Sequence, residues 1–278
     1  MKKIAFCFLI YDMINHEDIW NLFFENVDTN KYTIYIHYKT NKPLSYFEKY
    51  KLTHCIETKY EDHTIPLAYN VLFREAYNDI DNQKFCILSG SCIPLKSFDF
   101  IYDKLTRNDY GYFNVSPQSQ CFPNCHSLVD NNIVDKELIS KSHNWFILNR
   151  KLVENLCFDK DDLLKQHYST IYAPAEYFYY TFIKVLQLEK EIITTPNIAS
   201  DATTFTNWRD MVPVYKYPSM RGLKNYSSVS EEELLYLLQS DSLFGRKFNV
   251  ECHSSLVTNT TYIRCINGSA AASAAVDL

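Results

Sequence analysis

Two short clusters of side chains in this sequence have the types and spacing of metal ligands. Asp79 and Asp81 form an Asp-x-Asp, whose hard carboxylate oxygens suit Mn²⁺ or Mg²⁺ beside a diphosphate. Cys121, Cys125 and His126 offer the thiolate and imidazole ligands that zinc takes, but no second ligand pair follows at zinc-finger spacing. We interpret these three residues as part of a plain loop. The Asp pair precedes a predicted strand at the end of a helix, which favours a solvated helix terminus over a metal motif.

The composition excludes several classes of protein. The chain has only 5 glycines in 278 residues, and they lie too far apart to form the phosphate-binding loops GxGxxG or GxxxxGK[ST]. Its 28 Lys and Arg against 33 Asp and Glu give a net charge of −5, which argues against nucleic acid as a partner. Because 46% of the residues are hydrophobic, we expect the chain to fold rather than to stay disordered.

No apolar run approaches the ~18 residues that a membrane span needs, so the sequence predicts no transmembrane segment. Residues 1–3 (MKK) and the apolar residues 4–10 imitate a signal peptide. No small-residue cleavage site follows, and we therefore interpret the run as a buried first strand. The nine cysteines, an odd number, are then expected in a reducing compartment, mostly as buried thiols.

Short apolar runs alternate with longer helical patterns, which predicts an α/β fold with a mostly parallel sheet flanked by helices. The predicted strands cover residues 3–10, 32–38, 55–58, 85–88, 110–115 and 145–148. The predicted helices cover residues 15–24, 66–77, 98–105, 150–156, 177–188 and 231–238. We expect a single domain over residues 1–267, because no linker divides them. Residues 268–278, rich in Ala and Ser, have the composition of an added linker or tag remnant.

The carboxyl ends of the predicted strands are the expected place for a ligand, because open α/β sheets bind ligands beyond those ends. The segments after Ile10, Tyr38, Leu88 and Val115 are therefore candidate walls, and tyrosines are frequent near them. Aromatic rings stack on nucleobases and on sugars, so this distribution fits a nucleotide-sugar site. The long polar stretch 116–142 is typical of a functional loop, and we assign it to acceptor selection.

Five blocks of this sequence follow the order of the motifs of one enzyme family. Residues 85–95 (FCILSGSCIPL) match FVLLSxSCIPL, and residues 36–37 (IH) match the start of IHVD. Residues 141–146 (KSHNWF), 173–178 (APAEYF) and 242–248 (SLFGRKF) match KGSQWF, PDEhyf and LFARKF. Through these blocks the chain resembles the core-2/I-branching β-1,6-N-acetylglucosaminyltransferases, glycosyltransferase family 14, and within that family its plant-type branch.

This resemblance implies a GT-A-type fold and an inverting glycosyltransferase that uses a UDP-sugar without a divalent metal. It implies that Glu176 is the general base, which takes the proton of the acceptor hydroxyl as that hydroxyl attacks the anomeric carbon. Ala175 replaces the family's Asp before the base, a departure that removes a polar partner. The alternative is that Glu176 only complements the dipole at a helix N-terminus.

Fixed cations would replace the metal at the diphosphate of the departing UDP. Lys247 matches the family's Lys in the KF motif, and Arg246 precedes it. An ungapped count places Lys224 where the family has a second, arginine ligand, with Arg221 as the alternative. A lysine there would lose the bidentate contact that arginine makes. The competing interpretation is that these residues are ordinary surface cations.

Metal-dependent enzymes of this fold carry Asp-x-Asp just after a central strand, and here that place holds Ser89 and Gly90. With no carboxylate there, we expect no metal cofactor and assign Ser89 and Gly90 to the side of the sugar donor. A metal-dependent transferase that uses Asp79 and Asp81 stays as an alternative, and it predicts that EDTA abolishes activity.

The same resemblance implies roles for two aromatic residues. Tyr60 aligns with a tyrosine beside the uracil ring, and Trp208 with a tryptophan that packs on the acceptor sugar. We also assign Trp145 to substrate binding. Lys39 replaces the family's Asp after IHV, which puts a uridine contact there in doubt. His37 is interpreted as a structural histidine.

We expect the sugar donor to be UDP-GlcNAc, with UDP-xylose or another UDP-sugar as the alternative, and the acceptor to be a glycan or glycoprotein. A catalytically silent glycan-binding module is the alternative from another class. The animal enzymes of the family are anchored Golgi proteins, and this chain shows no anchor or secretory signal. We therefore expect it to act in a cytoplasm of bacterial or viral type.

Overall fold

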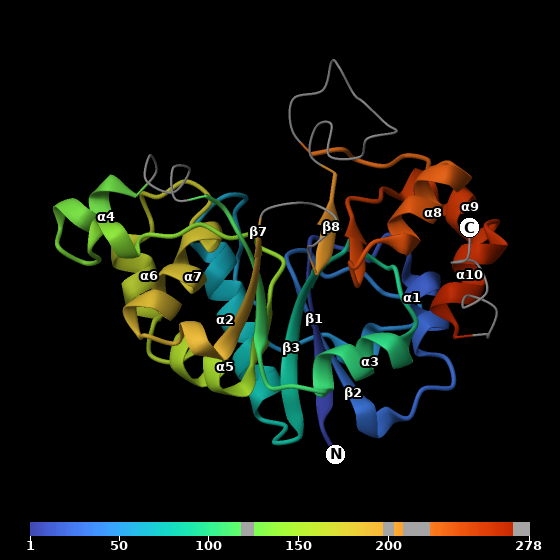
Figure 1. Ribbon diagram of the computed structural model, residues 1–278, viewed down its shortest axis with the longest axis horizontal. Coiled ribbons are helices and arrows are strands. Elements are labelled where there is room, and N and C mark those ends of the chain that lie inside the picture. The colour runs from blue at the N-terminus through green and yellow to red at the C-terminus, as the bar shows by residue number, and fades with distance from the viewer. Residues whose placement is uncertain (118–124, 197–202, 208–222, 269–278) are drawn as a thin grey trace.

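The computed structural model describes residues 1–117, 125–196, 203–207 and 223–268, and its central feature is a six-stranded sheet (Figure 1). In spatial order its strands are β2 (Tyr32–Tyr38), β1 (Lys3–Ile10), β3 (Asn82–Ser89), β6 (Ile147–Asn149), β5 (Gly111–Val115) and β7 (Ile192–Pro196). Strand β1 is parallel to β2 and β3, and β5 is parallel to β7, whereas the short β6 is antiparallel to both of its neighbours. The prediction of a mostly parallel sheet flanked by helices is confirmed.

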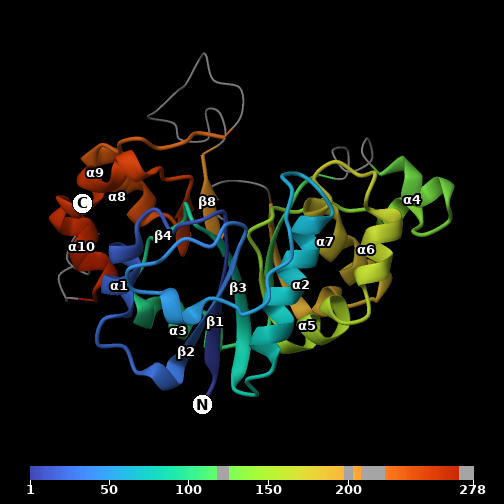
Figure 2. The ribbon, with the colours of Figure 1, turned by 180° about the vertical axis from the view of Figure 1, so that it is seen from behind.

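Helices cover both faces of this sheet. Their bounds are α1 (Glu17–Phe24), α2 (Thr64–Tyr77), α3 (Phe98–Thr106), α4 (His126–Asp130), α5 (Arg150–Cys157), α6 (Asp161–His167), α7 (Ala175–Val185), α8 (Glu231–Gln239), α9 (His253–Val257) and α10 (Thr260–Ile266). Ala5 and Cys7 of β1 face the core beneath α2, α5 and α7, whereas Phe6 and Phe8 face α1 and α3 on the other side. Because both faces are buried, the strand is a continuous apolar run. Figures 1 and 2 show α2, α5, α6 and α7 at one side of the molecule and α8 to α10 at the other.

A second, three-stranded sheet adjoins the first. It contains β4 (Ile93–Pro94), β9 (Phe244–Arg246) and β8 (Thr204–Thr206), in the order β4-β9-β8. Strand β9 is antiparallel to β4 and parallel to β8, so that Arg246 lies opposite Thr206. Buried side chains of α8 and α10 pack against this sheet in a separate apolar cluster. The small sheet thus fixes the position of the basic residues that end β9.

Three segments differ from the sequence prediction. The predicted strand at residues 55–58 is wrong, because this segment joins no ladder and the N–H of Ile56 instead donates to Nε2 of His37, at 3.0 Å. The stretch 116–142 contains α4 and a 3₁₀ turn over Lys136–Leu138 within its described part. Helix α7 begins two residues earlier than predicted, and Glu176 therefore lies in its first turn.

None of the helices in the described ranges combines the length and the apolarity that a membrane span requires. Six of the eight cysteines in those ranges are buried, as predicted. Helix α10 ends at Ile266, beside the predicted domain boundary, and the predicted tail from residue 269 onward lies outside the described residues.

Candidate active site

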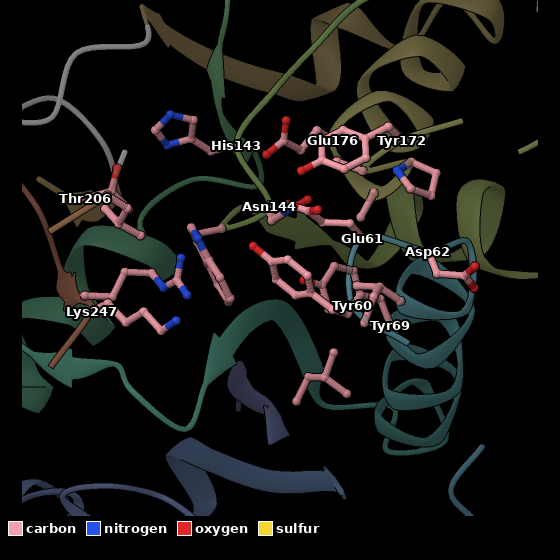
Figure 3. Close-up of a pocket in the computed structure, with 18 of the residues that line it drawn as sticks. Tyr60, Glu61, Asp62, Tyr69, His143, Asn144, Tyr172, Glu176, Thr206 and Lys247 are labelled. Carbon is pink, nitrogen blue, oxygen red and sulfur yellow. The ribbon is translucent and has the colours of Figure 1, made fainter. Parts of the chain in front are cut away.

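A pocket of about 600 Å³ opens where the carboxyl end of β1 meets the starts of α2 and α7 and the small sheet (Figure 3). Leu9 of β1 lies in its lining, together with Thr206 and parts of the segments 60–69, 143–145, 172–176, 223–225 and 246–247. These segments are far apart in the sequence, and the fold brings them together at the edge of the sheet where α/β folds bind ligands.

One side of the pocket, which we call the cationic wall, consists of Arg246 and Lys247 at the end of β9. The Arg246 guanidinium lies over the ring of Trp145, 4.0 Å from its centroid. Burial lowers the pKa of Arg246, and burial together with the neighbouring Arg246 charge lowers the pKa of Lys247. Neither cation forms an ion pair with any residue in the described ranges. Two desolvated cations side by side favour an anionic ligand.

Beside these cations lie buried polar atoms that have no hydrogen-bond partner among the residues that the structure describes. They are Oγ1 of Thr206, Oδ1 of Asn144 and Nε of Arg246. Thr206 is only 1% exposed, and it lines the pocket. Buried polar groups of a folded protein almost always have partners, so these atoms are suited to receive a ligand.

Glu176 faces the same pocket from the first turn of α7. Its Oε2 lies 3.0 Å from Nζ of Lys141, and about a quarter of each side chain is exposed. The backbone holds these two residues together, because the N–H of Ser142 donates to the carbonyl of Glu176 at 2.8 Å. The predicted base and the predicted phosphate ligand Lys247 therefore line one pocket, and Figure 3 shows them on opposite sides of it.

A carboxylate and two tyrosines stand on the same side as Glu176. The carboxylate of Glu61 lies next to the hydroxyls of Tyr60 and Tyr172 and raises the pKa of both groups. The hydrogen bond to Glu61, followed by desolvation, raises the pKa of Tyr172 to about 12. Desolvation, followed by the bond to Glu61, raises the pKa of Tyr60. We call Glu61 and Glu176 the carboxylate wall.

Three of the predicted ligands of the sugar donor do not line the pocket. Both carboxylate oxygens of Glu233 bind Nζ of Lys224, at 2.8 and 3.0 Å, and Glu233 is buried. Oγ of Ser89 lies 3.1 Å from Oγ of Ser91. A Cβ at Gly90 would lie 2.3 Å from the carbonyl oxygen of Met13, so glycine is required there by close backbone packing.

The other predicted residues divide between the pocket and the undescribed ranges. Tyr60 and Trp145 line the pocket, and Tyr60 is 82% exposed. Trp208 and Arg221 lie outside the described residues. His37 is buried and accepts a backbone hydrogen bond, as expected of a structural histidine.

The described residues of the two metal-like clusters do not line this pocket. Asp79 and Asp81 lie next to the start of β3, where Asp79 pairs with Lys3 at 2.8 Å. Cys121 lies outside the described residues, and Cys125 is buried next to α4. Within the described ranges, no three His, Cys, Asp or Glu side chains come together as metal ligands would.

Sequence reasoning did not find Glu61, Tyr172, Asn144 or Thr206. Tyr172 lies four residues before Glu176. In a helix that included both residues, this spacing would place their side chains one turn apart. Glu61 and Thr206 lie in no motif, and only the fold brings them to Glu176 and Arg246. The one available signal was that Glu61 directly follows the predicted ligand Tyr60.

Comparison with known proteins gives consistent findings. The model of the family described as "Branch: Core-2/I-Branching enzyme" matches residues 4–238. The chain is 21% identical over 168 residues to glycosyltransferase BC10 of Oryza sativa subsp. japonica, an alignment that covers 58% of this chain and 42% of the rice protein. It is 37% identical over 68 residues to xylosyltransferase 1 of Rattus norvegicus, covering 23% of this chain and 8% of the rat protein. The matched part of the chain thus covers less than half of the length of each of these curated relatives.

Proposed function

The chain belongs to the Core-2/I-Branching enzyme family, a family of glycosyltransferases with a GT-A-like fold, and we propose that it transfers a sugar from a UDP-sugar to a hydroxyl group. We propose further that the transfer inverts the anomeric centre and needs no divalent metal. The observation that carries this proposal is the pocket itself, in which two cations without ion-pair partners among the described residues face Glu176 across a space large enough for substrates.

In this mechanism Glu176 accepts the proton of the acceptor hydroxyl as its oxygen bonds to the anomeric carbon. The bond from that carbon to the UDP oxygen breaks, and the electron pair leaves with the diphosphate. Arg246 and Lys247 stabilise the negative charge that develops there, a contribution that is large because both groups are held in place and partly desolvated.

In this proposal Arg246 is the second cationic ligand of the diphosphate, the role that the family resemblance assigns to Lys224 or Arg221. The guanidinium can bind two phosphate oxygens at once, and Trp145 fixes its plane by stacking. Lys224 already neutralises the buried Glu233, so moving it to a phosphate would leave that carboxylate uncompensated.

For the sugar donor we propose UDP-GlcNAc, with UDP-xylose as the alternative that the similarity to a xylosyltransferase supports. Tyr60 and Trp145 supply aromatic surfaces for the uracil or the sugar. We propose a glycan or a glycoprotein as the acceptor.

Release of UDP from UDP-GlcNAc and UDP-xylose, measured with EDTA and again with Mn²⁺, tests the proposal. We expect release in EDTA, and a decrease of about 10²–10⁴-fold in Glu176→Gln. Glu154→Gln makes the same chemical change on the exposed face of α5, away from the pocket lining, and serves as the matched control.

Three outcomes would contradict parts of this proposal. Release that requires Mn²⁺ would refute metal independence. Equal release by Glu176→Gln and Glu154→Gln would refute the assigned base. Binding of UDP-sugars without any release of UDP, with or without an acceptor, would favour a silent binding module.

A further inference from the structure

The acceptor must lie beside Glu176 if this residue removes its proton, and the structure shows which side chains surround that place. Figure 3 shows Glu61 and Tyr172 on the same side of the pocket as Glu176, whereas Lys247 lies on the opposite side. The pocket is thus divided between a half suited to an anionic diphosphate and a half that carries two carboxylates.

From this division we propose that Glu61 and Tyr172 form the acceptor subsite and that they select an uncharged sugar. The inference rests on the proposed function, and it adds the residues and the ligand chemistry of the acceptor side.

The ring of Tyr172 provides a surface for a sugar. Tyr172 is 58% exposed at the pocket, a large exposure for an aromatic side chain next to a cavity. The faces of aromatic rings pack well against the C–H groups of a pyranose. The hydroxyl of Tyr172 lies next to Glu61, so the ring and the carboxylate face the same part of the pocket.

Glu61 provides acceptor atoms for sugar hydroxyls. An ionised carboxylate has about four lone-pair positions. Even if the neighbouring hydroxyls of Tyr60 and Tyr172 take two of these, Glu61, which lines the pocket, has positions left to accept hydrogen bonds from a ligand. Asp62, the third carboxylate at the pocket, differs because one of its oxygens accepts the N–H of Thr64, at 3.0 Å, at the start of α2.

The backbone holds these two side chains in a fixed relation. Glu61 and Ala173 both adopt left-handed conformations, with φ of 57° and 52°, and the N–H of Ala173 donates to the carbonyl of Glu61 at 3.1 Å. Left-handed backbone is unfavourable for residues other than glycine and tends to persist at functional sites. The bond joins the segment before α2 to the segment before α7, so the subsite is organised before a ligand arrives.

The charges explain the selection of an uncharged sugar. Glu61 and Glu176 stand on one wall, and the Lys141 ammonium already pairs with Glu176. A carboxylate or sulfate on the acceptor would be brought close to Glu61 with no cation in the described part of that wall left to bind it. Like charges at short distance in a partly desolvated pocket repel each other strongly.

The test measures initial rates with methyl β-galactoside, methyl N-acetyl-α-galactosaminide and methyl β-glucuronide as acceptors. We expect turnover of a neutral glycoside and at least about tenfold lower kcat/KM for the glucuronide. In Glu61→Gln we expect KM for the neutral glycoside to rise about tenfold or more, the loss expected for hydrogen bonds to a charged group. The preference over the glucuronide should also shrink.

Tyr172→Phe keeps the ring and removes the hydroxyl, and we expect a rise of about threefold in acceptor KM because a polar group next to Glu61 is lost. Glu57→Gln is the matched control, because it changes an exposed carboxylate of the same segment outside the pocket lining. Thermal melting of each variant verifies that it is folded.

Measurement of UDP release distinguishes failure of the proposed function from failure of the proposed acceptor subsite. UDP release from the sugar donor alone should be the same in the wild type and in Glu57→Gln, the variant outside the pocket lining. If the wild type releases no UDP under any condition, the proposed function fails. If UDP release is normal and acceptor KM in Glu61→Gln and Tyr172→Phe stays within twofold of the wild type, the subsite is refuted while the proposed function stands. A change in donor KM instead of acceptor KM would place Glu61 in the donor half and refute the subsite as well.

Discussion

On the cationic wall, Arg246 and Lys247 have no ion-pair partner in the described ranges, whereas on the carboxylate wall Glu176 is paired with Lys141 and Glu61 lies next to two tyrosine hydroxyls. Burial destabilises the charged forms of both cations and lowers their pKa values. We propose that a diphosphate removes the electrostatic cost of the cationic wall. On the carboxylate wall Glu176 already has a counter-charge, and we propose that this wall orients a neutral ligand.

Lys224 is a cation whose charge is neutralised within the fold. It lies between β8 and α8 in the chain, binds both oxygens of Glu233 and packs over the ring of Tyr226 at 4.2 Å. The same residue type is thus structural at position 224 and exposed to a ligand pocket at position 247. Substitutions at the two positions should separate stability from ligand binding.

The largest expected effect is on stability, in Lys224→Met. Removal of the ammonium leaves Glu233 buried without its counter-charge, and we expect a loss of about 3–5 kcal/mol in the free energy of unfolding. Urea denaturation measures this change. The dissociation constant for UDP, measured by calorimetry at a temperature where the variant is folded, should stay within about twofold. A large loss of UDP affinity with unchanged stability would show that Lys224 is a phosphate ligand.

The second effect is on catalysis, in Arg246→Met. The methionine keeps an apolar contact with Trp145 but removes the charge, and we expect kcat/KM for the sugar donor to fall by about 10²–10³. Arg246→Lys should recover only part of this loss, because lysine binds phosphate at one point. Steady-state rates against UDP-sugar concentration measure both variants. Full activity in Arg246→Met would show that the cationic wall does not act on the diphosphate.

Lys247→Met should affect ligand binding and stability in opposite directions. We expect UDP affinity to fall by about tenfold, since one charge-assisted contact is lost. Stability should rise by about 1 kcal/mol, because a desolvated cation next to Arg246 is removed. Calorimetry with UDP and urea denaturation are the measurements. A decrease in stability like that of Lys224→Met would mean that Lys247 has a structural partner.

His37 is a desolvated base outside the pocket lining, and the effect on stability expected from its protonation is the smallest of these effects. Burial lowers its pKa to about 4 from an ordinary value of 6.5, and its Nε2 accepts the N–H of Ile56 only when the imidazole is neutral. The unfolded chain therefore binds this proton at a higher pH than the folded chain does. Stability should fall as the pH decreases from 6.5 to about 4, by about 1.4 kcal/mol per pH unit for this group.

Urea denaturation across this pH range, compared with His37→Gln, isolates the effect. Glutamine can accept the same backbone hydrogen bond but does not titrate. The other buried histidine, His16, has a pKa lowered to about 4 by burial as well, and its contribution cancels because both proteins contain it. Parallel pH dependences of the wild type and His37→Gln would contradict the assignment.

The sequence predicted the elements that depend on local patterns. The apolar run of β1 and the helical spacing of α2 are confirmed, because burial on both faces and a periodic apolar stripe are visible without a partner segment. The segment 55–58 was assigned wrongly as a strand. Its β-like residues are held by the side chain of His37, a contact between distant positions that periodicity does not register.

For the site, the sequence by itself determined the family through five ordered blocks, and with it Glu176 and Lys247 as residues of one site. Only the tertiary structure decided that Lys224 forms an ion pair with Glu233 and that Arg246 stacks on Trp145. It also decided that Glu61 and Tyr172 lie beside Glu176. The physical reason is that the availability of a charge depends on which groups the fold places next to it. Residues from segments far apart in the chain form this pocket, and the order of residues in the sequence does not give the distances between them.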